Sequence, residues 1–370
     1  MQLSYWEVKN WFTGVDYTVI GSGIVGLNTA LRLRERFPKS RILILEKGAL
    51  PQGASTKNAG FACFGSLSEI IEDLKNHSED DVLHLIEKRW KGLGLLRKRV
   101  GDAALDYRPY GGYELFLKQD ESTYAECRAK MPFVNDLLRP MFKSDVYNLQ
   151  TDRFNFGKTR EQLVFNPFEG QIDSGMMMQA LLKQVAAADI QLLNSQELIG
   201  YETLQDGVVV QLKDFSFTTR KLVLATNGFA AQQGISGVVP ARAQVLITEP
   251  IPNLDLKGTF HLDKGYYYFR NVGDRILFGG ARNLDFVGET TTTLANTKII
   301  QDQLELMLKE VILPQHKFTI AQRWSGIMGM GPDKNPIVQS LSDHVYCGVK
   351  LSGIGIAIGG LIGQELADLV

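Results

Sequence analysis

Three glycines and one carboxylate near the start of the chain are spaced as in a nucleotide-binding turn. Gly21, Gly23 and Gly26 fall within one short turn, and Glu46 follows twenty residues after Gly26. In such a turn the first glycine permits a tight bend, the second lets the backbone approach a pyrophosphate, and the third lets a helix pack on the preceding strand. A carboxylate at position 46 can accept both hydroxyls of a ribose and would repel a 2′-phosphate. The spacing therefore predicts a dinucleotide site.

The segments around these glycines have the patterns of the elements that must hold them. Residues 16–20 are a short β-branched run, residues 27–37 are amphipathic, and residues 41–45 are a second apolar run that ends at Glu46. Strand, turn, helix and strand make a βαβ unit, in which the free N–H groups and the positive end of the helix dipole face the phosphates. A glycine-rich surface turn is the alternative for an isolated motif, but here every flanking part is present.

A second stretch of small residues, 53–62, follows the βαβ unit. A nicotinamide-binding domain would continue here with another strand and helix. Instead, small residues run together, which lets the backbone lie against a flat ligand. A flexible surface loop is the alternative, and the apolar residues Ala59, Phe61 and Ala62 argue against it. The stretch predicts contact with a planar group.

Beyond residue 65 the chain alternates helical and strand patterns. Helices are expected over residues 66–100, 121–138, 174–188 and 297–311, and short strands over 190–193, 198–203, 207–213, 215–219, 221–226 and 344–349. Aromatic strands over 245–248, 265–270 and 275–280 predict an antiparallel sheet inserted between parts of the nucleotide domain.

Four further segments have weaker patterns. Residues 1–15 are expected to pack on the body as a lead-in arm, and residues 146–168 are expected to be irregular. Residues 324–338 are rich in Gly and Pro before a strand, and a last helix is expected to start at 350. Three polar residues, Gln364, Glu365 and Asp368, argue against a membrane-spanning role for this apolar tail.

The composition narrows the class of protein. A chain of 370 residues that is 44% hydrophobic can bury a large core, and its length predicts two domains. A net charge of −1 gives no electrostatic reason to expect nucleic acid or an anionic membrane as partner. The three cysteines are widely spaced and fit reduced thiols, and the five histidines show no metal-ligand spacing, so no metal is expected. Because the N-terminus lacks a basic and apolar leader pattern, we expect a soluble, cytoplasmic protein.

Seven segments together resemble the D-amino-acid oxidase superfamily of FAD-dependent oxidoreductases, which includes glycine oxidases, sarcosine oxidases and D-amino-acid dehydrogenases. In chain order they are DYTVIGSGIVGLNTALRL, LILEKG, GASTKNAGFA, GQID, LVLATNG, WSGIMGMGPDKNPIV and GVKLSGIGIAIGG. The resemblance implies an α/β fold with a Rossmann-like FAD-binding domain from roughly 1–75, 170–235 and 320–370. It also implies an inserted α+β substrate domain from roughly 76–169 and 236–319, whose antiparallel sheet lies over the flavin.

The resemblance also implies which residues hold a non-covalent FAD. The first turn would hold the pyrophosphate, Glu46 the adenosine ribose and the backbone near Leu198 the adenine. The N-terminus of the last helix would stabilise negative charge on the reduced flavin. The residues expected at the cofactor are Gly21, Ser22, Gly23, Ile24, Val25, Gly26, Glu46, Lys47, Gly53, Ala54, Ser55, Thr56, Lys57, Asn58, Ala59, Gly60, Phe61, Ala62, Leu198, Ala225, Thr226, Asn227, Gly228, Gly326, Ile327, Leu351, Ser352, Gly353, Ile354, Gly355 and Ile356.

The reaction implied by the resemblance is oxidation of the C–N bond of a D-amino acid or secondary amine. Hydride passes to flavin N5, the imine hydrolyses, and oxygen or a quinone-type acceptor takes the electrons. No side-chain base is required if the amine binds unprotonated. Two positions depart from the family pattern: Met328 stands where amino-acid oxidases commonly have a carboxylate-binding arginine, and Leu277 where sarcosine oxidases have a lysine.

Other side chains are therefore candidates for the substrate. Arg270 and Arg282 can bind a carboxylate, although a salt bridge is the alternative for each. Tyr268 shares a strand face with Arg270 by alternation and is the leading substrate-contact tyrosine, with core packing as the alternative. Lys57 faces either the flavin or solvent, and Met328 stays a candidate by its position. Covalent attachment of the flavin through Cys63 is not favoured.

Two other functions compete with an amine oxidoreductase. An NAD-dependent dehydrogenase predicts a continued β-α repeat at residues 53–62, which the sequence lacks. An FAD module associated with tRNA modification predicts a basic face, which the balanced charge does not favour. A small-molecule amine or amino acid is therefore the expected partner.

Overall fold

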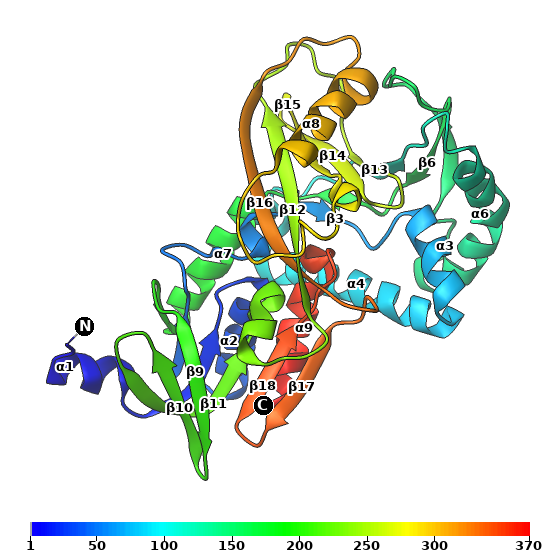
Figure 1. Ribbon diagram of the computed structural model, residues 1–370. Coiled ribbons are helices and arrows are strands. Elements are labelled where there is room, and N and C mark those ends of the chain that lie inside the picture. Colours follow the sequence, from blue (N-terminus) through cyan, green and yellow to red (C-terminus); the bar gives the residue numbers. More distant parts are fainter. Residues whose placement is uncertain (1) are drawn as a thin grey trace.

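The computed structural model describes residues 2–370, which form two large sheets with helices packed around them (Figure 1). In the first sheet, five parallel strands run in the order β8 (Gln191–Leu193), β2 (Ile42–Leu45), β1 (Val15–Ile20), β11 (Ser216–Leu224) and β18 (Val345–Val349). The antiparallel strands β17 (Ile337–Ser342), β10 (Gly207–Leu212) and β9 (Leu198–Leu204) extend it. The expected α/β class with a Rossmann-like unit is confirmed.

Alternation along the central strands gives the first sheet two apolar faces, since successive side chains point to opposite sides. Val19 and Ile44 face one side, where helices α2 (Ile24–Arg36), α4 (Glu79–Val100), α7 (Ser174–Ala187) and α9 (Gly355–Leu369) cover them. Ile20 and Leu45 face the other side, where they pack with β10 and with Phe12. Both faces are buried, which explains the continuous apolar runs in the sequence.

The second sheet is mainly antiparallel and lies above the first in Figure 1. Its order is β16 (Ile320–Met330), β12 (Val239–Thr248), β15 (Arg275–Gly280), β14 (Tyr267–Val272), β13 (Thr259–Leu262), β4 (Gly112–Glu114), β6 (Gln162–Asn166) and β5 (Asn148–Thr151). Helix α8 (Lys298–Met307) packs on an aromatic core in which the rings of Phe260 and Phe269 stack at 4.6 Å. The aromatic strands predicted from the sequence are thus part of this sheet.

The remaining elements connect or flank the two sheets. Helices α3 (Leu67–Asn76), α4 and α6 (Glu121–Phe142) share a fourth apolar cluster. The short strands β3 (Phe61–Ala62) and β7 (Gly170–Gln171) pair with each other, and α1 (Tyr5–Glu7) and α5 (Asp102–Leu105) are single turns. Phe12 anchors the N-terminal arm as expected, but Tyr5 and Trp6 are exposed, so only part of the arm packs on the body.

Three predicted segments differ from the structure. The helix expected over 66–100 is divided at Ser78, whose side chain accepts a hydrogen bond from the backbone N–H of Asp81 and so caps a second helix. The strands expected over 215–219 and 221–226 are one strand, β11. The segment expected to be irregular, 146–168, contains β5 and β6. β6 pairs with β4 and β5 pairs with β6, and this cross-strand pairing supplies hydrogen bonds that a weak local pattern does not reveal.

The largest difference lies at residues 324–338. The Gly-rich part of this segment belongs to β16, which pairs along its whole length with β12. Residues 320–330 are therefore part of the second sheet rather than of the FAD-binding segment that was expected to begin at 320. The division of the chain into two domains otherwise stays a prediction. Among residues 2–370, no helix is both long and apolar enough to cross a membrane.

Candidate active site

A cavity of about 740 Å³ lies where the two sheets meet. It is lined by the turn after β1, the loop after β2, strands β13 to β15, the end of β16 and the turn before α9. This volume is in the range of small-molecule and cofactor sites. The two small-residue stretches of the sequence, 53–62 and 350–356, therefore converge on one cavity although they are far apart in the chain.

Most residues predicted at the cofactor line this cavity. They are Gly21, Gly23, Ile24, Val25, Glu46, Lys47, Gly53, Ala54, Ser55, Lys57, Asn58, Ala59, Gly60, Phe61, Leu198, Ala225, Thr226, Asn227, Gly326, Ile327, Leu351, Ser352, Gly353, Ile354, Gly355 and Ile356. The other five, Ser22, Gly26, Thr56, Ala62 and Gly228, lie outside the lining and pack or hydrogen-bond behind it. Direct contact with a cofactor stays a prediction for the lining residues and is not expected of these five.

The turn at Gly21 has the geometry that its glycines require. Gly21 has a φ of +102°, and a Cβ at this position would lie 2.8 Å from the carbonyl oxygen of Ala225. A Cβ at Gly26 would lie 2.0 Å from the carbonyl oxygen of Gly21, so the helix could not approach the turn. The turn therefore leaves backbone open to the cavity at the start of α2.

Glu46, directly after β2, holds this turn in place through hydrogen bonds. Its buried carboxylate accepts hydrogen bonds from the backbone N–H of Ser22 at 3.0 Å, the hydroxyl of Ser22 at 2.6 Å and the backbone N–H of Gly48 at 3.0 Å. This bracing role was not anticipated from the sequence. Glu46 also lines the cavity, so its predicted contact with a ribose stays a prediction.

The turn before α9 is a second turn that lines the cavity. Lys350, Ser352 and Gly353 have φ values of +65°, +48° and +86°, and helix α9 begins only at Gly355 rather than at 350 as expected. The hydroxyl of Ser352 is buried, lines the cavity and has no hydrogen-bond partner among residues 2–370. A buried polar atom without a partner is the kind of group that a bound ligand satisfies.

Four of the residues considered for substrate binding, Lys57, Tyr268, Arg282 and Met328, line the cavity, as does Tyr266. Burial raises the pKa of Tyr268 to about 12, so its hydroxyl remains protonated and can donate a hydrogen bond. Tyr268 lies on β14, and Tyr266 lies directly before this strand.

Arg270 does not line this cavity. Its guanidinium donates hydrogen bonds to the backbone carbonyl oxygens of Ala59, of Ile172 at 2.9 Å and of Asn271 at 3.1 Å. Burial lowers its pKa to about 10. The expectation that Arg270 binds a substrate carboxylate is therefore wrong: its donors hold the 53–62 loop against β14 and β7.

Arg282, directly after β15, has no such partners. Its side chain makes no hydrogen bond or ion pair with residues 2–370, and its guanidinium lies over the ring of Phe286, 4.8 Å from the ring centroid. Burial lowers its pKa, but a guanidinium stays charged at neutral pH. Arg282 lines the cavity, and a half-buried guanidinium without an ion-pair partner can bind a carboxylate through two parallel hydrogen bonds.

A buried charged pair at the cavity, His261 and Glu169, was not predicted from the sequence. His261 on β13 lines the cavity and is 2.9 Å from Glu169, which also accepts a hydrogen bond from the hydroxyl of Thr259. Burial alone would lower the pKa of His261, but the charge and hydrogen bond of Glu169, with smaller effects of Glu69 and Glu114, raise it to about 9. His261 is therefore an imidazolium at neutral pH.

Cys63 lies beside this pair, and burial raises the pKa of its thiol well above the ordinary value. The donor atoms of Cys63, Glu169 and His261 lie within 4.8 Å of one another, which is close enough to share a metal ion. The carboxylate of Glu169 is already shared by His261 and Thr259, so the arrangement is a buried ion pair beside a thiol. No sequence spacing could have revealed it, because the three residues come from three distant segments.

Replacing Glu169 with glutamine should change how stability depends on pH. Because the pKa of His261 is raised from 6.5 to about 9, the pair stabilises the fold fully below about pH 6.5 and loses this effect as the pH rises through 9. We expect Glu169→Gln to lower the free energy of unfolding by roughly 2–3 kcal/mol near pH 6, with a much smaller loss near pH 10. Thermal unfolding measured across this range checks it. Glu161→Gln, an exposed site nearby, serves as control, and a loss that is equal at both pH values would contradict the assignment.

Comparison with known proteins gives the family. A profile described as "FAD dependent oxidoreductase" matches residues 16–369. The chain belongs to this family. The open turn at Gly21, the partnerless hydroxyl of Ser352 and the size of the cavity fit FAD, the cofactor of the family. The family match therefore supports FAD, rather than NAD, as the cofactor of the nucleotide turn.

Curated relatives and solved structures agree with this assignment. Probable oxidoreductases OrdL of Haemophilus influenzae and Rhizobium meliloti are each 22% identical, over 96% of this chain and 82% of theirs. A glycine oxidase from Geobacillus kaustophilus has a TM-score of 0.76 at 20% identity, covering 96% of this chain and 94% of its own. An L-proline dehydrogenase from P. horikoshii has a TM-score of 0.74 at 19% identity, covering 96% and 92%. At this identity the structures show a shared fold.

Proposed function

We propose that this FAD-dependent oxidoreductase oxidises the C–N bond of an amino acid or N-substituted amino acid whose carboxylate pairs with Arg282. The single observation that carries the proposal is the guanidinium of Arg282, which lines the cavity and has no ion pair with residues 2–370. Binding the two oxygens of a carboxylate, which share one negative charge, would satisfy its donors without breaking an existing contact. Met328 supplies no charge at the position expected for a carboxylate-binding arginine, so Arg282 takes that role.

The residues of the cavity would position the substrate rather than react with it. Arg282 would hold the carboxylate, the protonated hydroxyl of Tyr268 would donate to it or to the amine lone pair, and Met328 would supply an apolar wall. When bound, FAD takes up the two electrons and the hydrogen removed from the α-carbon. Water then hydrolyses the imine. No side-chain base is needed if the amine enters unprotonated, which agrees with a high pKa for Tyr268.

Stereochemistry and electron acceptor belong to the proposal as well. A D-amino acid is the first candidate, and the solved neighbours include both a glycine oxidase and an L-proline dehydrogenase, so an achiral or secondary amine is the second. Leu277 on β15 is buried and apolar where a sarcosine oxidase has a lysine, which favours slow reaction with oxygen and hence a quinone-type acceptor.

Anaerobic flavin reduction tests the function directly. The purified protein should be yellow, and D-amino acids, L-proline, N-methyl amino acids and acylated polyamines should be mixed with it in the absence of oxygen. We expect a carboxylate-bearing amine to bleach the flavin band, and reoxidation with a quinone to be faster than with air. Bleaching by amines without a carboxylate, at rates equal to those of their carboxylated counterparts, would contradict the role of Arg282.

A tRNA-modifying role is not proposed. No observation in the structure favours it, and the charge balance offers no strong electrostatic attraction to RNA.

A further inference from the structure

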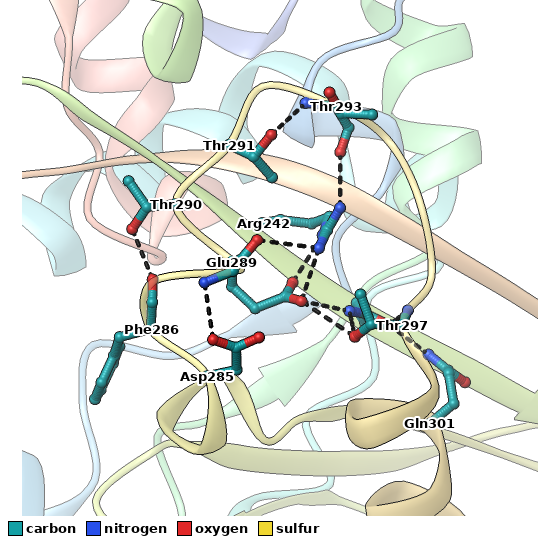
Figure 2. Close-up of polar contacts among 11 residues, drawn as sticks. Arg242, Asp285, Phe286, Glu289, Thr290, Thr291, Thr293, Thr297 and Gln301 are labelled. Atoms are coloured by element: carbon teal, nitrogen blue, oxygen red, sulfur yellow. Dashed lines mark hydrogen bonds and ion pairs between the residues drawn. The ribbon is translucent and has the colours of Figure 1, made fainter.

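Residues 285–297, here called the roof loop, connect the end of the β15 region to helix α8 (Figure 2). Arg242 on β12 anchors this loop from the second sheet. Its Nε and Nη2 donate to the two carboxylate oxygens of Glu289, each at 2.8 Å, which is a two-point ion pair. Its Nη1 and Nη2 also donate to the backbone carbonyl oxygens of Thr293 at 3.3 Å and Gly288 at 3.2 Å.

A second set of hydrogen bonds closes the base of the roof loop. The side-chain amide of Gln244 donates to Glu289 at 2.8 Å and to the hydroxyl of Thr297 at 2.7 Å, and the backbone N–H of Thr297 donates back to Gln244 at 2.9 Å. Glu289 is fully buried. Burial acts to raise its pKa, but the hydrogen bonds from Arg242 and Gln244 outweigh this effect and lower it. The carboxylate is thus held charged in one place, and the loop with it.

The anchored loop reaches the cavity at two points. Thr292 and Leu294 line it, and Leu294 keeps 41% of its surface exposed. At the other end of the loop, Phe286 lies under the guanidinium of Arg282 and edge-on to the ring of Tyr266, with ring centroids 5.8 Å apart. The roof loop therefore packs against Arg282, the residue proposed to bind the substrate carboxylate. It also places the apolar side chain of Leu294 in the lining of the same cavity.

We propose that the roof loop sets substrate specificity: Leu294 contacts the apolar part of a substrate whose carboxylate is held by Arg282, and the Arg242–Glu289 pair positions both. This inference rests on the proposed function. The class of substrate it names is an amino acid or N-alkyl amino acid with an uncharged, apolar chain. A charged chain would lose its hydration against Leu294, and neither loop residue in the cavity lining, Thr292 or Leu294, carries a charge to pair with it.

A series of simple carboxylates tests the contact without turnover. Acetate, propionate, butyrate and hexanoate are titrated into the oxidised holoenzyme, and dissociation constants are read from the change in the flavin absorption spectrum. We expect affinity to rise with chain length in the wild-type protein. Leu294→Ala should weaken hexanoate binding about tenfold and leave acetate binding unchanged, because only the long chain reaches position 294.

A matched control lies on the same loop. Val287 is 89% exposed and does not line the cavity, so Val287→Ala should leave the whole series unchanged. If Leu294→Ala keeps the wild-type dependence on chain length, the proposed contact is wrong while the role of Arg282 survives. If the wild-type protein binds none of the carboxylates, the proposed function fails and the loop inference fails with it.

Glu289→Gln tests the positioning pair by removing the charge and keeping the size. We expect FAD content to be retained and the affinity for both acetate and hexanoate to fall at least fivefold, because Phe286 and Leu294 are no longer fixed. Glu289→Asp keeps the charge and should recover part of the affinity. A Glu289→Gln protein with a lower melting temperature and unchanged carboxylate affinities would show that the pair stabilises the fold only.

Discussion

Replacing Arg282 with methionine is expected to lower kcat/KM for the best substrate of the reduction screen by about 10²–10³-fold. The side chain of methionine fills a similar space but offers no donor, so the substrate carboxylate would enter a half-buried site without a counter-charge. Loss of one partner from a desolvated, hydrogen-bonded charge pair costs on the order of 2–5 kcal/mol. Most of the loss should fall on substrate affinity, measured as the concentration dependence of anaerobic flavin reduction.

Two further variants define what this result means. Arg282→Lys keeps the positive charge but lacks the planar guanidinium that donates two parallel hydrogen bonds. Its kcat/KM should therefore lie between those of the wild type and of Arg282→Met. Arg275 lies at the start of β15, the strand that precedes Arg282. It pairs with Glu249 and is not part of the cavity lining, so Arg275→Met should leave kcat/KM unchanged. Wild-type kinetics in Arg282→Met would remove the observation on which the proposed function depends.

Replacing Gly21 with alanine is expected to abolish stable FAD binding. A φ of +102° is strained for any residue with a Cβ, at a cost of about 1–3 kcal/mol, and the new methyl group would lie 2.8 Å from the carbonyl oxygen of Ala225. Since neither backbone can move without shifting β1 or β11, the turn and the start of α2 would be displaced. The purified variant should be colourless, as measured by the ratio of flavin to protein absorbance.

Gly94→Ala is the control, because Gly94 lies on α4 and is not part of the cavity lining. A Cβ at Gly94 would meet no atom within 4 Å outside its own helix. We expect this variant to keep its flavin. A yellow Gly21→Ala protein with wild-type FAD content would show that the turn does not hold the cofactor.

The sequence was sufficient for the features that depend on local chemistry. The glycines of the first turn, Glu46 at the end of β2 and the small residues at 53–62 are each defined by steric needs that act over a few residues. The strands of the first sheet could be predicted for the same reason, since their apolar runs are buried on both faces. These features predicted an α/β protein with a dinucleotide site, and the family resemblance implied FAD; the family match and the fold confirm both the fold class and the cofactor.

Tertiary structure alone decided what each charged side chain does. Arg270 and Arg282 are equivalent by residue type, yet the first is saturated by three backbone carbonyls and the second faces the cavity. The pairing of His261 with Glu169 and of Arg242 with Glu289 joins residues more than 40 positions apart. Strand propensity is also overridden, as in β16, where pairing with β12 outweighs its glycines.

The physical reason is the range of the interactions involved. Backbone sterics and apolar periodicity act between near neighbours in the chain, so they can be recognised from the order of the residues. Hydrogen bonds and ion pairs of buried charges depend on distances of about 3 Å between segments that meet only when the chain is folded. The turn at Gly21 depends on interactions of the first kind, between near neighbours. Arg282 and the roof loop depend on the second kind, between distant segments.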